Sequence, residues 1–153
     1  MGFLTGKTAI ITGGGRAVLS NGECGSIGYG IATAYAKEGA NLVVTGRNVQ
    51  KLTDAKEELE KKYGIKVLPV QADVSAGSDN EAIVQNVVKQ AIDTFGRIDV
   101  LINNAQASAS GVTIADHTTE QFDLAVYSGL YAAFYYMKAC YPYLKETKGS
   151  VIN

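Results

Sequence analysis

The chain contains the stretch Thr8-Ala-Ile-Ile-Thr-Gly-Gly-Gly15, which resumes after Arg16–Cys24 as Gly25-Ser-Ile-Gly-Tyr-Gly-Ile-Ala32. An apolar run typical of a strand ends in consecutive glycines, and a second glycine cluster opens a segment of helical period. This order predicts a phosphate-binding loop, because glycines let the backbone approach an anion and a helix N-terminus is partly positive. A flexible loop is the alternative, since the spacing matches no strict glycine motif. The candidate residues are Gly13, Gly14, Gly15, Ser26, Ile27 and Gly28.

Apolar runs alternate with amphipathic helical segments along the rest of the chain. Nearly all-apolar strands separated by such helices are typical of a parallel sheet covered on both faces. We therefore predict a single α/β domain over residues 1–153, with the chain ending inside its fifth strand. The first helix should pack through Ile27, Ile31, Ala32, Tyr35 and Ala36. The predicted strands are 7–12, 41–45, 66–71, 98–102 and 149–153, and the predicted helices are 26–38, 49–63, 79–95 and 118–144.

The end of the second predicted strand reads Thr45-Gly-Arg-Asn48 and contains no acidic residue. In dinucleotide-binding folds an acid at this point binds the ribose 2′-hydroxyl, whereas an arginine accommodates a 2′-phosphate. Arg47 is placed to make charge-assisted bonds to a phosphate, next to Asn48, and Arg16 in the glycine loop could add a second cation. We therefore expect NADP(H) rather than NAD(H). A solvated arginine in front of a charged helix is the alternative.

Composition and charge argue against several classes of binding partner. The 153 residues are 46% hydrophobic and carry a formal net charge of −1, so nucleic acid and anionic membranes are not expected partners. No apolar run approaches the ~20 residues that span a bilayer. The segment Met1–Lys7 lacks the apolar part of a signal peptide, and we expect a cytoplasmic protein. His117 stands in a helix-capping segment without a partner ligand, so no metal is predicted.

Four elements together resemble the short-chain dehydrogenase/reductase family: Thr12-Gly-Gly-Gly15, Gly25-Ser-Ile-Gly28, Asp73-Val74 and Asn103-Asn-Ala105. The resemblance covers the whole chain and implies a Rossmann-type, doubly wound parallel sheet, truncated after the start of its fifth strand. It also implies that Asp73 and Val74 bracket the adenine and that Asn104 and Ala105 lie along the cofactor. Within the family, the segments 103–111 and 127–132 look most like bacterial hydroxysteroid dehydrogenases acting on bile acids, the 12α type especially.

The chain also departs from the family pattern. Gln106 stands where the family usually has Gly, and Gly129 falls where its helix carries an Asn that helps to hold a proton-relay water. The insertion Arg16–Cys24 lengthens the glycine loop, rather as in enoyl-acyl-carrier-protein reductases. The catalytic Ser, Tyr and Lys of the family follow the fifth strand, so we expect no catalytic residue within the printed chain.

Tyr141 and Lys145 imitate the catalytic Tyr-x-x-x-Lys spacing, which places a phenol and an ammonium on one helix face. They precede the fifth strand instead of following it. Pro142 inside the motif removes a helix N–H, so we expect the helix to kink or end near Cys140. The pair is therefore not expected to be catalytic. The neighbouring tyrosines suggest either a steroid-stacking surface or, preferably, core and interface aromatics.

These observations predict the cofactor-binding part of an NADP(H)-dependent oxidoreductase that acts on the CH–OH group of donors. The expected substrate is a small alcohol or ketone, with a steroid as one candidate, and the full-length enzyme is expected to be a homo-oligomer. The printed chain is expected to be inactive alone. Two alternatives stay open: a non-catalytic NADP-binding module and an enoyl reductase-like enzyme.

Overall fold

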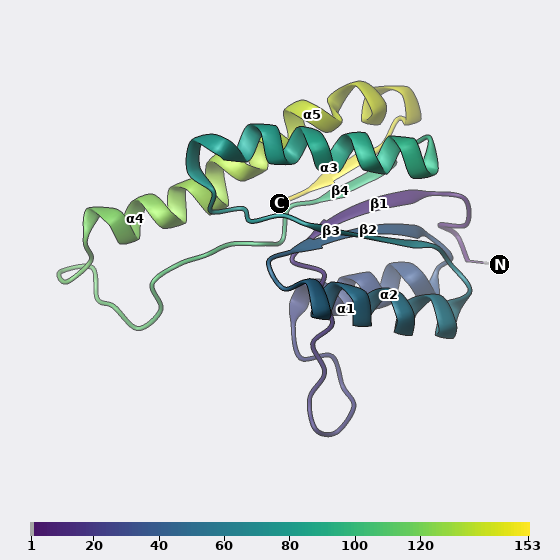
Figure 1. Cartoon of the computed structure of the whole chain (residues 1–153), viewed down its shortest axis with the longest axis horizontal. Helices are drawn as coiled ribbons and strands as arrows, with labels where there is room; N and C mark the ends of the chain where they lie inside the picture. The colour runs from purple at the N-terminus through teal and green to yellow at the C-terminus, as the bar shows by residue number, and fades with distance from the viewer. Residues whose placement is uncertain (1) are drawn as a thin grey trace.

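The computed structural model describes residues 2–153, and Met1, the first residue of the predicted domain, lies outside the described residues. Strands and helices alternate along the chain (Figure 1). The strands are β1 (Thr8–Thr12), β2 (Asn41–Gly46), β3 (Val67–Gln71), β4 (Val100–Ile102) and β5 (Ser150–Ile152). The α-helices are α1 (Ile27–Lys37), α2 (Val49–Tyr63), α3 (Asn80–Phe95), α4 (Thr119–Ala125) and α5 (Ala132–Thr147). A 3-10 turn, η1 (Gly77–Asp79), precedes α3, and a π-helical segment, η2 (Val126–Tyr131), joins α4 to α5.

The five strands form one parallel sheet in the order β3-β2-β1-β4-β5. Helices α1 and α2 cover one face and α3 and α5 the other (Figure 1). Because successive strand residues point to opposite faces, the buried side chains divide into two cores. Ile11 and Val44 pack with α1 and α2, whereas Ile10 and Val43 pack with α3 and α5. The predicted doubly wound parallel sheet is therefore confirmed.

Local signals set the helix ends where the sequence predicts them. Ser26 is the N-cap of α1 and its side chain accepts a hydrogen bond from the Tyr29 N–H. Gly64 and Gly96 end α2 and α3 in the left-handed conformation, with φ of 68° and 71°. The expected packing role of Ile27 is wrong, because its side chain is 77% exposed. The packed stripe of α1 runs instead through Gly28, Tyr29, Ala32 and Ala36, which places Ile27 beyond the edge of the core.

Of the two effects expected of Pro142, a kink or an end of the helix near Cys140, the end is wrong, since α5 continues through Pro142 to Thr147. Tyr136, Cys140 and Leu144 are buried at four-residue intervals on both sides of the proline. This continuous apolar face packs against α3 and the sheet. Tertiary packing therefore outweighs the local loss of one helix N–H.

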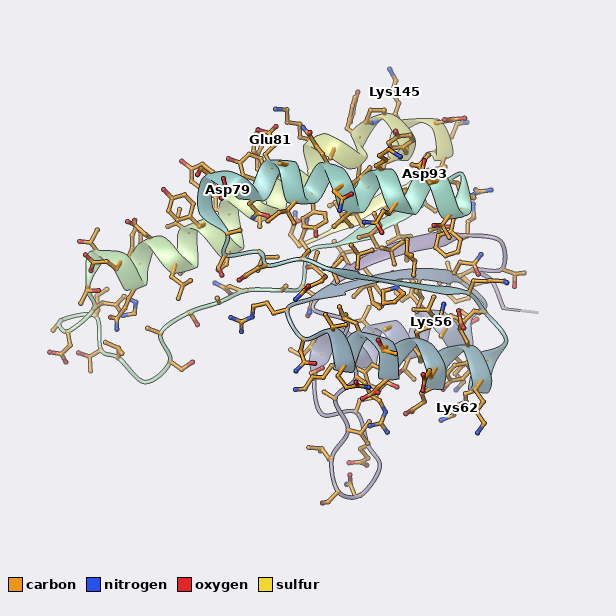
Figure 2. All side chains as sticks on the ribbon, in the orientation of Figure 1. Lys56, Lys62, Asp79, Glu81, Asp93 and Lys145 are labelled. Atoms are coloured by element: carbon orange, nitrogen blue, oxygen red, sulfur yellow. The ribbon has the colours of Figure 1, made fainter. Side chains whose placement is uncertain are left out.

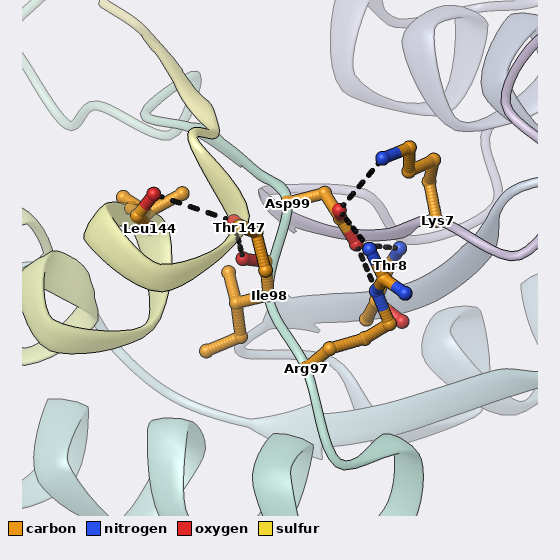
Figure 3. Close-up of polar contacts among 7 residues, drawn as sticks. All are labelled: Lys7, Thr8, Arg97, Ile98, Asp99, Leu144 and Thr147. Atoms are coloured by element: carbon orange, nitrogen blue, oxygen red, sulfur yellow. Dashed lines mark hydrogen bonds and ion pairs between the residues drawn. The ribbon is translucent and has the colours of Figure 1, made fainter.

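A polar cluster fixes the chain just before β4 (Figure 3). The Asp99 carboxylate accepts hydrogen bonds from the Thr8 N–H at 2.9 Å and from two nitrogens of Arg97 at 2.8 and 2.7 Å. Lys7 lies 3.3 Å from the same carboxylate. On the other side, the Thr147 hydroxyl donates to the Ile98 carbonyl at 2.8 Å. The start of β4 is thus tied both to β1 and to the end of α5.

The β5 side of the molecule presents apolar groups to solvent. Val151 and Ile152, on the edge strand β5, are 40% and 48% exposed. Leu130 and Phe134 are also exposed, and the Tyr127 and Tyr131 rings contact each other on this surface with centroids 5.2 Å apart. The tyrosines of η2 and α5 therefore divide between surface and core, since Tyr127 and Tyr131 are exposed whereas Tyr136 is 1% exposed.

Candidate functional site

Loops at the carboxyl ends of β1, β2, β3 and β4 surround a cavity of about 280 Å³. It lies where the strand order reverses, because β2 and β4 flank β1 on opposite sides. Open parallel sheets bind ligands at this point. The predicted site residues that line it are Gly13, Arg47, Asp73, Val74, Asn104 and Ala105.

The glycines of the first loop allow a close approach between β1, α1 and the loop after β4. Gly13 has φ of 73°, a conformation that favours glycine. A Cβ at Gly28 would collide with the Gly13 carbonyl oxygen and lie 2.6 Å from Nδ2 of Asn104. A Cβ at Gly14 would lie 3.0 Å from the Val44 side chain on β2. Gly14 and Gly28 therefore serve packing, and neither lines the cavities at this edge.

Thr12 positions the loop after β4, a role that sequence reasoning did not assign to it. Its buried hydroxyl accepts hydrogen bonds from the backbone N–H groups of Asn104 and Ala105, both at 2.9 Å. The Asn104 side chain donates in turn to the Thr12 carbonyl at 2.9 Å. These three bonds fix residues 104 and 105 beside the glycine loop, 92 positions away in the sequence.

The insertion after the glycines is a small closed loop. The backbone N–H of Gly25 donates to the Ala17 carbonyl at 2.7 Å, and Val18 pairs with Cys24 in an antiparallel bridge. Figure 1 shows this loop projecting away from the sheet. Its closure brings Gly15 and Ser26 to the wall of one cavity of about 250 Å³.

Arg47 and Asn48 line this second cavity as well, at the carboxyl end of β2. The Asn48 side chain caps α2 by accepting from the Lys51 N–H at 3.0 Å, so its orientation is fixed. Lys51, in the first turn of α2, also lines the cavity. Sequence reasoning missed Lys51, although its spacing from a capping Asn places it on the first helical turn. No acidic residue lines this cavity.

Arg16 does not line either cavity. Its Nε donates to a carboxylate oxygen of Glu58 on α2 at 2.5 Å, 42 residues away. The hydrogen bond from Arg16 lowers the pKa of Glu58, so the pair is ionised at neutral pH. Arg16, which the sequence suggested as a second cation beside Arg47, is therefore paired with Glu58. The residue that lines the cavity together with Arg47 is Lys51.

Asp73 follows β3 and forms a compact turn with Ser75. The Asp73 carboxylate accepts from the Ser75 N–H at 2.9 Å and from its hydroxyl at 2.6 Å. Burial raises the pKa of Asp73, but these bonds and the charge of Arg47 outweigh it and leave the pKa below its usual value. The first cavity thus has one fixed carboxylate, Asp73, on the β3 side and one cation, Arg47, on the β2 side.

Residues 7–153 match the family model described as short chain dehydrogenase. The chain belongs to the short-chain dehydrogenase family. It is 65% identical over its whole length to a 12α-hydroxysteroid dehydrogenase of a Clostridium species and covers 56% of that protein. The chain spans about half the length of the curated relatives it matches.

Solved structures agree with this short-chain dehydrogenase fold. An alcohol dehydrogenase from the archaeon Thermococcus sibiricus, complexed with 5-hydroxy-NADP, matches 95% of this chain and 56% of its own with a TM-score of 0.82 and 28% identity. L-sorbose reductase from Gluconobacter frateurii, complexed with NADPH and L-sorbose, matches 99% and 52% with a TM-score of 0.82 and 31% identity.

A third cavity, of about 290 Å³, adjoins the first on the β4–β5 side. Asn103, Gln106, Ser128, Gly129 and Asn153 contribute to its walls. Neither Tyr141 nor Lys145 lines any of the three cavities described here. Figure 2 shows Lys145 pointing outward from α5.

The segment around His117 caps a helix, as predicted. The Thr118 hydroxyl accepts from the Gln121 N–H, and the Thr118 N–H donates to the Gln121 side chain. Within residues 2–153, the His, Cys, Asp and Glu side chains form no group of three that could hold a metal ion. Over the same residues, no helix is both long and apolar enough to cross a membrane.

Proposed function

We propose that this chain is the NADP(H)-binding part of an oxidoreductase that acts on the CH–OH group of donors, with a hydroxysteroid as the substrate class. The observation that carries the proposal is the cavity at the end of β2, which is lined by Arg47 and Lys51 and by no carboxylate. A 2′-phosphate would find two cations there, whereas a ribose 2′-hydroxyl would lack its acidic partner.

The remaining residues fit the other parts of a dinucleotide. Gly15 in the glycine loop and Ser26 at the N-cap of α1 would hold the pyrophosphate through backbone N–H groups and the helix N-terminus. Gly13, whose own N–H donates to the Thr45 carbonyl at 2.9 Å, would let the backbone approach the phosphate closely. Asp73 and Val74 would hold the adenine, with Asn104 and Ala105 along the cofactor. The nicotinamide supplies or accepts the hydride, and the protein's contribution is to bind and orient it.

The substrate class rests on the relatives. The Clostridium relative, at 65% identity, is a 12α-hydroxysteroid dehydrogenase, and the L-sorbose reductase structure contains NADPH and a small polyol ketone. We extend this to the present chain as reversible exchange of a hydride between the nicotinamide and a secondary alcohol or ketone. The residues that move the proton are proposed to lie outside the printed sequence, so the printed chain alone should bind nucleotide without turnover.

The exposed aromatic face of η2 and α5 supports a homo-oligomer of the full-length enzyme. Leu130, Tyr131 and Phe134 are 68%, 44% and 52% exposed on one side of this helical region. Apolar side chains gathered in this way commonly mark an interface. A second copy of the chain would bury them.

Nucleotide affinities of matched variants test the cofactor proposal. Arg47→Asp and Lys51→Ala should each weaken NADP(H) by about 1–3 kcal/mol through loss of a charge-assisted contact, and should change NAD(H) far less. Lys61→Ala is the control, because Lys61 is exposed at the opposite end of the same helix, about 15 Å along its axis and beyond effective screening distance. Calorimetric titration of both dinucleotides measures the difference. Equal affinity of the unmodified protein for NADP(H) and NAD(H) would contradict the proposal.

A further inference from the structure

A polar cluster outside the cavity at the end of β2 joins three of the elements that form the walls of that cavity. Its members are Arg16 at the start of the insertion, Tyr29 in the first turn of α1 and Glu58 on α2. Nε of Arg16 donates to a carboxylate oxygen of Glu58 at 2.5 Å, and both side chains are about one-third exposed. The function assigned above uses none of these three side chains.

Arg16 fastens the glycine loop to α2 at two points. Its backbone N–H donates to the Lys51 carbonyl at 2.7 Å, and its side chain reaches Glu58, about two helical turns further along α2. A Cβ at Gly15 would lie 3.2 Å from the Lys51 Cβ, so the loop also packs against the first turn of this helix. Because Gly15 and Lys51 both line the cavity, the attachment of Arg16 sets the separation of these two walls.

Tyr29 brings the start of α1 into the same cluster. Its side chain is 1% exposed and packs with Leu52 and Leu59 of α2 in one core. Its backbone N–H donates to the hydroxyl of Ser26 at 3.3 Å, so the two residues form one fixed turn. Burial, and to a smaller extent the charge of Glu58, raise the pKa of Tyr29, so the phenol stays neutral beside the carboxylate.

The insertion makes an attachment of this kind necessary. The hydrogen bond from Gly25 to Ala17 ties the two arms of the insertion to each other, but it does not tie them to α2. A loop closed only at its base would be free to pivot and would carry Gly15 with it. Arg16 stands directly outside the closed base and connects it to α2 (Figure 1).

We propose that Arg16 and Glu58 form a clamp that positions the glycine loop for nucleotide binding. The clamp keeps Gly15 and Ser26 at a fixed separation from Lys51, so the anion site is in place before the ligand arrives. Ordering a loop on binding costs free energy, and a site that is already ordered avoids that cost. Arg16 and Glu58 are positioning residues, since neither lines the cavity. The inference rests on the proposed function, because it assigns the pyrophosphate of NADP(H) to these loop ends.

Nucleotide affinities of clamp variants of the full-length protein, measured well below Tm, test the positioning role. Glu58→Ala should weaken NADP(H) and NAD(H) by the same factor, about three- to fivefold, because the ion pair is partly exposed and both dinucleotides contain the pyrophosphate. Arg47→Asp should instead change the ratio of the two affinities. Glu57→Ala is the matched control, because it removes the same charge from the adjacent, exposed position of α2, and it should leave both affinities nearly unchanged.

A double-mutant cycle separates the clamp from simple stabilisation. Arg16→Ala should match Glu58→Ala, the double variant should be no weaker than either, and Arg16→Lys should keep at least half of the affinity because its ammonium can still pair with Glu58. A pair that only stabilised the fold would lower Tm and leave these affinities unchanged, and that result would overturn the inference. Additive losses would also overturn it. So would tighter NADP(H) binding by Glu58→Ala, since Glu58 would then be withholding the Arg16 cation from the nucleotide.

Trypsin reports on the clamp without any nucleotide. The bond after Arg16 is cleaved when the arginine side chain leaves Glu58 and enters the specificity pocket of the protease, so the rate follows the population of the open loop. Glu58→Ala should raise the rate of this cleavage about three- to fivefold, and Glu57→Ala should not, as mass spectrometry of the fragments measures. Equal rates in the three proteins would overturn the inference. Failure of the unmodified protein to bind either dinucleotide would refute the proposed function, and the cleavage rates would still decide the clamp.

Discussion

Replacing Asp99 by alanine should destabilise the protein more than any exposed acidic substitution. The carboxylate is 4% exposed and is the shared acceptor for the Thr8 N–H, Arg97 and Lys7 (Figure 3). It lies at the start of β4, which pairs with β1 in the centre of the sheet. Removing it therefore weakens the junction of the two strands whose carboxyl ends carry the candidate site.

The magnitude follows from which groups are left without a partner. Thr8 is 1% exposed, so its N–H would lose its acceptor in a buried position, at a cost of about 1–3 kcal/mol. The side chains of Arg97 and Lys7 are each 42% exposed, so water solvates their charges and each lost pair adds less than about 1 kcal/mol. We expect about 2–3 kcal/mol in total, or a Tm lower by about 4–10 °C.

Asp93 provides a matched control. It pairs with Lys89 one helical turn away on the surface of α3, and its side chain is 59% exposed (Figure 2). Asp93→Ala should cost about 0.5 kcal/mol or less. Thermal and urea unfolding of the two variants measure the difference, and equal losses would refute the reasoning.

The same carboxylate predicts a pH dependence. Burial raises the pKa of Asp99, but the hydrogen bonds from Arg97, Thr8 and Lys7 outweigh it, so the net pKa lies below the ordinary value of 3.8. A depressed folded-state pKa contributes stability that is complete above the unfolded-state pKa and is lost as pH falls through the folded one. Tm should therefore fall more steeply below about pH 4 in the unmodified protein than in Asp99→Asn. Parallel curves for the two proteins would contradict this assignment.

Two further outcomes are expected from single measurements. Cys24 is exposed, whereas Cys140 is fully buried and burial raises the pKa of its thiol to about 12, so a thiol reagent should label one cysteine in the folded chain and two in denaturant. Labelling of both in the native state would contradict the packing of α5. Pro142→Ala should raise Tm by about 3–6 °C. The stability gained from the restored helix N–H should exceed the stability lost because the unfolded chain becomes more flexible without the proline. A lower Tm would mean that the proline fits its helix without cost.

Periodicity and capping residues predicted the fold because both act over short distances. Apolar runs defined the strands, and Gly64 and Gly96 marked helix ends that need the left-handed conformation. The errors arose where distant packing decides. Ile27 belongs to the apolar period of its helix but lies beyond the end of the core, and Pro142 is carried within α5 by burial on both sides of it.

The residues of the candidate site also fall into those that local sequence could predict and those that it could not. The places of Gly13, Gly15 and Arg47 on the cavity walls could be predicted, since backbone freedom and charge are properties of the residues themselves. Their contact with a nucleotide stays a prediction. Pairings across the chain could not: Arg16 binds Glu58, and Thr12 binds the loop at Asn104, over separations of 42 and 92 residues. Neither partner is marked by a local pattern. Lys51 was detectable in principle, because a capping Asn48 fixes which residues form the first turn of α2.

The interrupted glycine motif shows why residue spacing along a chain can miss residues that lie together in the folded structure. Counted along the chain, Gly15 and Ser26 are separated by the insertion, and no strict phosphate-binding pattern is met. In space, the hydrogen bond from Gly25 to Ala17 closes the insertion at its base, and the pair Val18–Cys24 continues the closure. Closing a longer loop costs only a slowly rising entropy, so an insertion with a bonded base disturbs its flanks little. Under the proposed function a phosphate would contact the two loop ends, Gly15 and Ser26, which line one cavity. The insertion therefore separates these residues in the sequence without separating them in space.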